Sequence, residues 1–254
     1  MMFLLTNDDG IYAKGLSSLY EELSQDADCL IVAPEIEQSA VGHAVTIFRP
    51  LMVRRAMKNN NFLGYAVYGT PADCVKIGVK ELAQKPVDLV VSGINRGSNA
   101  GINVIYSGTV SAATEAAIMG IPSLAVSLDT HKEVDFTYAA KIARQIARLI
   151  LSNPLLRGSA INVNVPCLPQ DKIKGVMVVK QGKGNVMESF EKREDPRENT
   201  YYWISGQYKS TAGEEDTDVH ALAAGYVTVT PIQYDLTRYD LLDFLTQAVK
   251  KNGL

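Results

Sequence analysis

The sequence predicts an α/β fold in which helices cover a mostly parallel sheet. Short apolar runs alternate with helical patterns as far as about residue 165, and this alternation is typical of βαβ units. Several of the runs are apolar without interruption, as in strands that are covered on both faces. The length of 254 residues fits one large domain, or a domain with an appendage.

Five segments of this first part are predicted to be strands. In chain order they are Met2–Thr6, Cys29–Ala33, Asp88–Ser92, Ser123–Ser127 and Ala160–Val165. Three apolar stripes at helical spacing lie between them. They run through Leu16, Leu19, Tyr20 and Leu23, then through Val75, Val79 and Leu82, and then through Ile142, Ile146, Leu149 and Ile150. We interpret these stripes as the faces by which helices pack on the sheet.

The pattern changes after Pro166. Further strands are predicted at Lys174–Lys180, Tyr201–Trp203 and Tyr226–Thr230, and a last helical stripe runs through Leu241, Leu242, Leu245 and Val249. The charged stretch Glu188–Asn199 is expected to run through solvent, and an acidic loop is expected at Glu214, Glu215 and Asp216. We therefore predict one domain over residues 1–254, with a core of about residues 1–170 and an extension of about residues 171–254.

Composition excludes several classes of function. The formal net charge of −3 gives no cationic field that would attract a nucleic acid duplex or an anionic membrane. The apolar run at the amino terminus is too short for a signal peptide or a membrane span, so the cytoplasm is expected. The three cysteines form no CxxC pair, which argues against a thiolate metal site. The motifs of P-loop and dinucleotide-binding proteins are absent from the sequence.

Four polar loops are expected to meet at one edge of the sheet. Ligands of open parallel sheets bind beyond the carboxyl ends of the strands. That rule selects residues 7–10, 35–42, 93–98 and the segment that leads into residues 106–109. Of the three histidines, only His43 is expected near this edge.

Asp8 and Asp9 stand side by side directly after the first predicted strand. Two carboxylates about 4 Å apart repel each other by roughly 4 kcal/mol at an effective dielectric constant near 20, and a divalent cation would reverse that cost. The same pair also fits a turn, with Asp8 as the cap of the next helix.

Ser39 and Asn95 would arrive at the same edge, each a few residues after its strand. Together with Asp8 and Asp9 they would form an all-oxygen site, which suits Mg²⁺ or Mn²⁺ and does not suit zinc. Each of the two also has a simpler interpretation, Ser39 as a loop cap and Asn95 as a turn before Gly97.

A helix is predicted to begin at Ser107, Gly108 and Thr109 in the stretch YSGTVSAATEAA. Its free N–H groups and its dipole would attract an anion, with the Ser and Thr hydroxyls as further donors. Alone this signal is weak, because Ser and Thr begin many helices. Facing a metal site, it becomes a candidate phosphate site.

Between residue 4 and about residue 231 the chain carries, in order, the motifs LLTNDDG, APEIEQSAVGH, GTPADCV, VSGINRGSNAG, YSGTVSAATEAA, NVNVP and GYVTVTP. This series resembles the SurE family of stationary-phase survival proteins, which are metal-dependent 5′(3′)-nucleotidases. The resemblance implies a Rossmann-like three-layer sandwich with a carboxyl-terminal hairpin and helix extension. It also implies a homodimer or homotetramer, in which the stretch from Glu188 to Trp203 would belong to the exchanged extension.

The resemblance further implies that Asp8, Asp9, Ser39 and Asn95 hold one divalent metal ion per subunit. The expected reaction is hydrolysis of nucleoside monophosphates, with short polyphosphate as a further substrate of some members. Asp8 or Asp9 would also orient the attacking water, and Asn99 would help the helix start at residues 107–109 to hold the phosphate.

Two alternatives remain open at the level of sequence. One aspartate could act as a covalent nucleophile, although the adjacent positions 8 and 9 differ from the alternate residues of a DxD motif. The protein could instead be a non-catalytic nucleotide or anion sensor, because the histidines provide no clear general base.

Overall fold

The computed structural model describes residues 1–132, 134–156, 158–183, 185–209 and 215–253. Its strands are β1 (Met2–Thr6), β2 (Asp28–Pro34), β3 (Val53–Lys58), β4 (Asn61–Val67), β5 (Leu89–Arg96), β6 (Ser123–Asp129), β7 (Ala160–Pro166), β8 (Val176–Val178), β9 (Asn185–Glu194), β10 (Thr200–Lys209) and β11 (Val227–Ile232). Its α-helices are α1 (Lys14–Leu23), α2 (Pro71–Ile77), α3 (Asn103–Tyr106), α4 (Gly108–Ile118), α5 (Thr137–Leu151), α6 (Asp218–Ala223) and α7 (Leu242–Lys251). A π-helical turn, Gly78–Leu82, continues α2.

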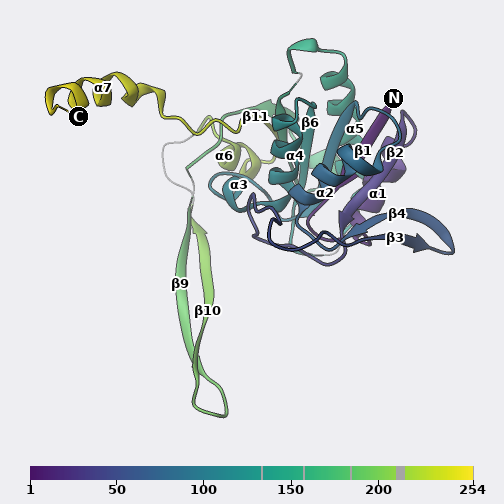
Figure 1. Ribbon diagram of the computed structural model, residues 1–254, viewed down its shortest axis with the longest axis horizontal. Helices are drawn as coiled ribbons and strands as arrows, with labels where there is room; N and C mark the ends of the chain where they lie inside the picture. Colours follow the sequence, from purple (N-terminus) through teal and green to yellow (C-terminus); the bar gives the residue numbers. More distant parts are fainter. Residues whose placement is uncertain (133, 157, 184, 210–214, 254) are drawn as a thin grey trace.

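The main sheet has the strand order β3-β4-β2-β1-β5-β6-β7-β11-β8, and β9 and β10 form a separate hairpin (Figure 1). From β4 to β7 every neighbouring pair is parallel. Only β3 and β11 run antiparallel to the strand beside them in that block. The carboxyl ends of the central strands therefore lie at one edge, and the predicted α/β fold is confirmed.

Helices cover both faces of the sheet and produce two apolar layers. Phe3 and Leu5 of β1 pack in a cluster with residues of α1 and α5, whereas Leu4 packs in a cluster with residues of α2 and α4. Side chains alternate between faces along a strand, so the unbroken apolar run of β1 serves both layers. This is the three-layer sandwich that the resemblance implied, and the continuous apolar strands are covered on both faces as predicted.

All five strands predicted in the first part of the chain are present, most of them longer by one to a few residues. The pair β3 and β4 was not predicted, because β3 carries charged and exposed residues in the run VRRAMK and gives no apolar pattern. Most of the charged stretch Glu188–Asn199 is also strand, in β9, where it pairs with β10. The charged residues correctly indicated that this stretch is exposed. They gave no sign that it would form a strand paired with β10.

The extension both completes the main sheet and projects from it. Strands β8 and β11 add to the sheet beside β7, while the hairpin and α7 reach away from the sandwich (Figure 1). Of the acidic loop predicted at residues 214–216, Glu214 lies outside the described residues. The division into a core and an extension near residue 170 stays a prediction. Over the part of the chain that is described, no helix has the combined length and apolar character needed to cross a bilayer.

Candidate functional site

A cavity of about 710 Å³ opens at the carboxyl edge of the central strands. It is lined by the loops that follow β1, β2, β5 and β6 and by the junction of α3 and α4. Six of the eight predicted site residues line it: Asp8, Asp9, Ser39, Asn95, Asn99 and Ser107. The structure therefore brings together residues that are up to a hundred positions apart in the sequence.

Asp8 is buried, and the first turn of α4 holds its carboxylate by hydrogen bonds. The Thr109 hydroxyl donates to Asp8 Oδ1 at 2.5 Å, and the Thr109 backbone N–H donates to Asp8 Oδ2 at 3.0 Å. Gly108 permits this approach, because a Cβ at that position would lie 2.9 Å from the Cβ of Asp8. Burial raises the pKa of Asp8 above its ordinary value, and the two bonds from Thr109 oppose that rise.

Asp9 is half-buried beside Asp8. Its Oδ2 accepts a long bond of 3.4 Å from the backbone N–H of Arg96. Burial, and then the negative charge of Asp8, raise the pKa of Asp9 to about 6. Two carboxylates that disfavour each other's ionisation in one cavity form a site that a cation would stabilise.

Ser39 reaches the cavity on the loop that follows β2. The backbone N–H of Gln38 donates to the carbonyl of Asp8 at 2.8 Å, which docks this loop against the aspartates. The Ser39 hydroxyl donates to Glu37 Oε1 at 2.5 Å. Since the proton of Ser39 is used in that bond, the lone pairs of its oxygen stay available as acceptors.

Asn95 lies near the end of β5 and is half-buried. Its amide nitrogen donates to the carbonyl of Gly97 at 2.8 Å, which fixes the amide and leaves its carbonyl oxygen as the group that can bind a cation. Gly97 has a φ of +108°, a conformation that favours glycine. The turn after β5 therefore both presents and orients Asn95.

The predicted phosphate contacts divide into two groups. Asn99 and Ser107 line the cavity, whereas Gly108 and Thr109 are buried behind Asp8. Ser107 is the N-cap of α4 and accepts a bond from the N–H of Val110. The side-chain amide of Asn99 donates to the hydroxyl of Ser127 at 2.9 Å. In this structure the backbone N–H and the hydroxyl of Thr109 both donate to Asp8, so Thr109 holds Asp8 in place and does not face the cavity.

The donor set fits a hard divalent cation by its chemistry. The described residues contain no cluster of three or more His, Cys, Asp or Glu side chains of the kind that holds a metal ion. A cation here would therefore depend on two carboxylates together with the neutral oxygens of Ser39 and Asn95. Such an oxygen set, with room in the cavity for water, suits Mg²⁺ or Mn²⁺. Their role as ligands stays a prediction.

The cavity also contains residues to which the sequence assigned no role as ligand or substrate contact. Glu37, Arg96, Tyr106, His131 and Ile204 all line it. Arg96 is the last residue of β5 and lies within the predicted loop 93–98, whereas His131 follows β6, where the same strand-end rule could have found it. Ile204 belongs to β10, and no local pattern in the sequence links that strand to the cavity.

The expectation that His43 alone lies near the site is wrong, because His131 lines the cavity and His43 does not. The Nε2 atom of His43 lies 2.8 Å from Oε2 of the buried Glu115, on α4. Lys76 from α2 contacts the other oxygen of Glu115 at 2.5 Å. His43 thus ties the loop after β2 to the helical layer.

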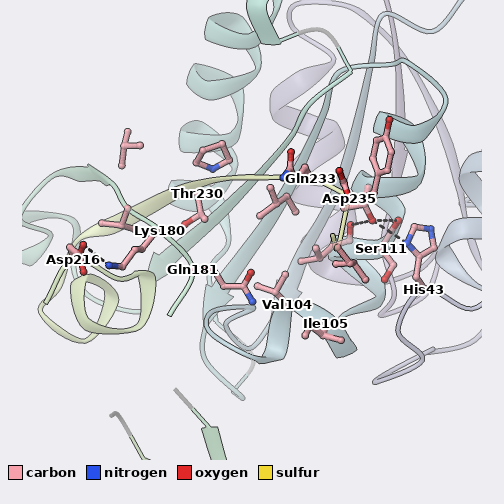
Figure 2. Close-up of a pocket in the computed structure, with 18 residues that line it drawn as sticks. His43, Val104, Ile105, Ser111, Lys180, Gln181, Asp216, Thr230, Gln233 and Asp235 are labelled. Atoms are coloured by element: carbon pink, nitrogen blue, oxygen red, sulfur yellow. Dashed lines mark hydrogen bonds and ion pairs between the residues drawn. The ribbon is translucent and has the colours of Figure 1, made fainter. Parts of the chain in front are cut away.

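A second cavity, of about 860 Å³, lies between α4, the β8 and β11 strands and the segment that follows them (Figure 2). It is lined mainly by apolar groups, with His43 and Ser111 on one side and the Lys180–Asp216 ion pair on the other. The paired carboxylates lie in the smaller cavity. We place the candidate site there because its polar groups converge.

Comparisons with known proteins agree on one family. The family described as "Survival protein SurE" matches residues 3–188. The chain is 62% identical over 252 residues to a protein from Syntrophus aciditrophicus named 5′-nucleotidase SurE, an alignment that covers 99% of this chain and 95% of the relative. A protein of the same name from Syntrophobacter fumaroxidans is 51% identical, over 96% of this chain and 98% of the relative. The crystal structure of a SurE protein from Aquifex aeolicus superposes with a TM-score of 0.84 at 39% identity and covers 98% of this chain and 99% of that one.

Proposed function

The chain belongs to the SurE family, and from that membership and the geometry of its cavity we propose that it is a metal-dependent phosphomonoesterase that hydrolyses nucleoside 5′- and 3′-monophosphates. As a SurE protein with relatives named 5′-nucleotidase, it is a nucleotidase, a phosphoric monoester hydrolase. The observation that supports the metal-dependent part is the convergence of Asp8 and Asp9 with Ser39 and Asn95 in one cavity.

The proposed ligands of the cation are Asp8, Asp9, Ser39 and Asn95. A bound Mg²⁺ or Mn²⁺ would polarise a phosphoryl oxygen and lower the pKa of a bound water. Glu37 adds a third negative charge at the same cavity, so the acidic groups outnumber the positive charge that Arg96 brings. This excess of negative charge supports a cation as part of the working site.

Other residues that line the cavity would bind and orient the substrate. Ser107, at the N-terminus of α4, and Asn99 would contact phosphoryl oxygens, and the guanidinium of Arg96 would add a charge-assisted bond. Asp9 is less buried than Asp8 and is the better placed of the two to orient the attacking water. His131 lies at the same cavity and would protonate the leaving nucleoside oxygen.

The test is phosphate release from AMP, GMP and their 3′ isomers, with Mg²⁺ or Mn²⁺ and again after chelation. We expect turnover with the metal, its loss with chelator and its recovery when metal is added back. A substrate panel that includes short polyphosphate would define the specificity. Turnover that persists after complete chelation would contradict the proposed metal dependence.

The alternative of a non-catalytic sensor predicts tight nucleotide binding without phosphate release. Its main support was the lack of a clear general base among the histidines. That support is weakened by Asp9, which would orient the attacking water, and by His131, which would protonate the leaving oxygen, because both line the cavity. The covalent route predicts a phosphoaspartate that can be trapped during turnover. In this structure Asp8 is held by Thr109 on both oxygens, which argues against Asp8 as the nucleophile.

We also propose that the protein works as a homodimer or homotetramer in the cytoplasm. The uncovered apolar side chains of the hairpin and of α7 support assembly. The cytoplasmic location stays a prediction from the sequence.

A further inference from the structure

Asp218 is a fully buried carboxylate at the start of α6, outside the cavity that holds Asp8 and Asp9. Its oxygens accept bonds from three backbone N–H groups. Gly101 donates to Oδ2 at 3.0 Å, and Gly182 and Val219 donate to Oδ1 at 2.7 and 2.8 Å. A buried carboxylate is costly unless it is satisfied, and here the main chain of three separate segments satisfies it.

The peptide groups of Gly101 are bound from two sides by the extension. While its N–H donates to Asp218, its carbonyl accepts a bond of 2.9 Å from the side chain of Gln181. Gly101 has a φ of +59°, in the left-handed region that favours glycine. Gly182 also packs closely, because a Cβ there would lie 3.2 Å from Asp218 Oδ1 and the carboxylate would have to shift by a few tenths of an ångström.

Gly101 lies in the middle of the loop that forms one wall of the candidate site. Two residues before it, the Asn99 N–H donates to Asn164 Oδ1 at 2.7 Å, and the Asn99 carbonyl accepts from Asn162 at 2.7 Å. Two residues after it, Asn103 begins α3 and lines the cavity. Strand β7 therefore holds the loop at Asn99, and the extension holds it at Gly101.

We propose that Asp218 is a positioning residue for the nucleotide: by binding the Gly101 peptide it fixes the loop that presents Asn99 and Asn103 to the cavity. This inference rests on the proposed function. Of the predicted metal ligands, Asp8, Asp9 and Ser39 lie on other loops. Asn95 lies in β5, ahead of the point at which β7 anchors the loop at Asn99, so the role of Asp218 is separable from cation binding. Gly182 lies just before β9, so the same carboxylate also fixes the base of the hairpin relative to this loop.

The test is Asp218→Asn, which keeps the shape of the side chain but turns an N–H₂ group or a neutral oxygen toward Gly101. We expect hydrogen exchange at the Gly101 amide to accelerate by about tenfold or more. We expect kcat/KM for a nucleoside monophosphate to fall by about tenfold or more, while the affinity for Mn²⁺ alone stays within about twofold. The matched control is Asp216→Asn, whose carboxylate forms an exposed ion pair with Lys180 at 2.7 Å and is expected to change neither quantity.

A second variant covers the case in which Asp218→Asn fails to fold. Gln181→Ala removes only the partner of the Gly101 carbonyl, and we expect a smaller change in the same direction in exchange and in kcat/KM. Unchanged exchange at Gly101 in the folded variant, or unchanged kinetics despite faster exchange, would overturn the proposal. A loss of Mn²⁺ affinity as large as the loss of kcat/KM would also overturn it, because it would show that the whole site had loosened. If the wild-type protein releases no phosphate, the proposed function fails, and exchange at Gly101 together with the affinity for inorganic phosphate still tests the positioning role.

Discussion

At the scale of single residues, the charge of Asp9 opposes the stability of the metal-free protein. Its pKa is raised to about 6, first by burial and then by Asp8, so the native state binds the proton more tightly than the unfolded chain does. The stabilising contribution of this group is therefore complete below about pH 4 and is lost as the pH rises through about 6. A bound divalent cation would offset this loss of stability, because it would stabilise the ionised form of Asp9.

The variant Asp9→Asn separates these two effects. In chelator near neutral pH we expect its Tm to exceed that of the wild type, with a difference that disappears near pH 4 because Asp9 is then protonated. Adding Mn²⁺ should raise the Tm of the wild type more than that of the variant, and turnover should fall together with metal affinity. Thermal scans with and without Mn²⁺ measure both, and unchanged turnover would remove Asp9 from the site.

Thr109 supports Asp8 through a hydroxyl that cannot reach solvent. Thr109→Val keeps the volume of the side chain and removes that donor, so one oxygen of a buried carboxylate loses its partner. We expect a loss of roughly 1–3 kcal/mol in the free energy of unfolding and a loss of about 10–100-fold in metal affinity. Denaturant titration and metal titration measure the two.

Thr114→Val is the matched control for that substitution. The Thr114 hydroxyl lies on the same helix, donates to the helix's own carbonyl groups and lies 3.3 Å from Nδ1 of His43, so it contacts neither aspartate. We expect this control to leave metal affinity unchanged. If both variants lost metal affinity alike, the effect would belong to α4 as a whole and the supporting role of Thr109 would be refuted.

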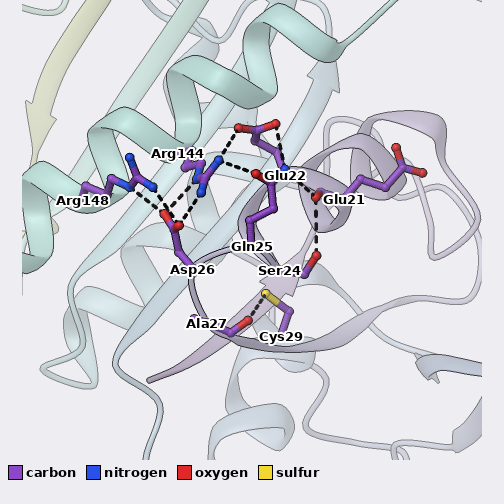
Figure 3. A network of polar contacts seen from close by, with 9 residues as sticks. All are labelled: Glu21, Glu22, Ser24, Gln25, Asp26, Ala27, Cys29, Arg144 and Arg148. Atoms are coloured by element: carbon purple, nitrogen blue, oxygen red, sulfur yellow. Dashed lines mark hydrogen bonds and ion pairs between the residues drawn. The ribbon is translucent and has the colours of Figure 1, made fainter.

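At the scale of elements, an ionic network joins the end of α1 to α5 (Figure 3). Asp26 accepts bonds from Arg144 at 2.5 and 2.9 Å and from Arg148 at 2.7 and 2.8 Å. Arg144 also reaches Glu22 of α1 at 3.1 Å. Hydrogen bonds from Arg144 and then Arg148 hold the pKa of Asp26 well below its ordinary value.

The sign of that shift gives a pH-dependent prediction. Because the pKa of Asp26 is depressed in the folded protein, its contribution is present above its ordinary pKa near 4 and is lost progressively as the pH falls below that value. We expect Asp26→Asn to lower the Tm at neutral pH and to have a shrinking effect in acid. Thermal unfolding across a pH series measures this. A variant with the Tm of the wild type at neutral pH would show that the network adds no net stability, as many exposed ion pairs do not.

Among the elements that the sequence predicted, the buried strands are those whose apolar residues form short runs in the sequence. β1 and β7 are covered on both faces, and their apolar runs are visible without a structure. The strand-end rule likewise brought Asp8, Asp9, Ser39 and Asn95 to one edge. Sequence could not show that Thr109 would turn its donors to Asp8, since a helix start binds an external anion and an internal carboxylate with the same groups. The bond between Gly101 and Asp218 joins residues 117 positions apart, and no spacing rule predicts it.

At the scale of the whole molecule, two parts of the extension, the hairpin and α7, expose apolar side chains that no other part of the described chain covers. The described part of α7 has no buried residue, although Phe244, Leu245 and Val249 give it an apolar side. On the hairpin, Tyr202 and Trp203 are each 59% exposed. Exposed apolar surface of this extent is characteristic of association sites, so we expect a dimer or a tetramer, whose mass light scattering would measure.

Trp203 makes that expectation measurable from within the chain, because it is the single tryptophan of the sequence. If another subunit covers the hairpin, the fluorescence of Trp203 in the assembled protein is that of a buried indole, and dilution below the dissociation constant shifts the emission to longer wavelength. Ile204→Lys should favour the dissociated form, because it places a charge at the centre of the apolar part of β10, whereas Lys192→Ala on the paired strand β9 serves as the control. A monomeric mass, together with an emission maximum that does not change on dilution, would show that the hairpin of this chain stands free in water.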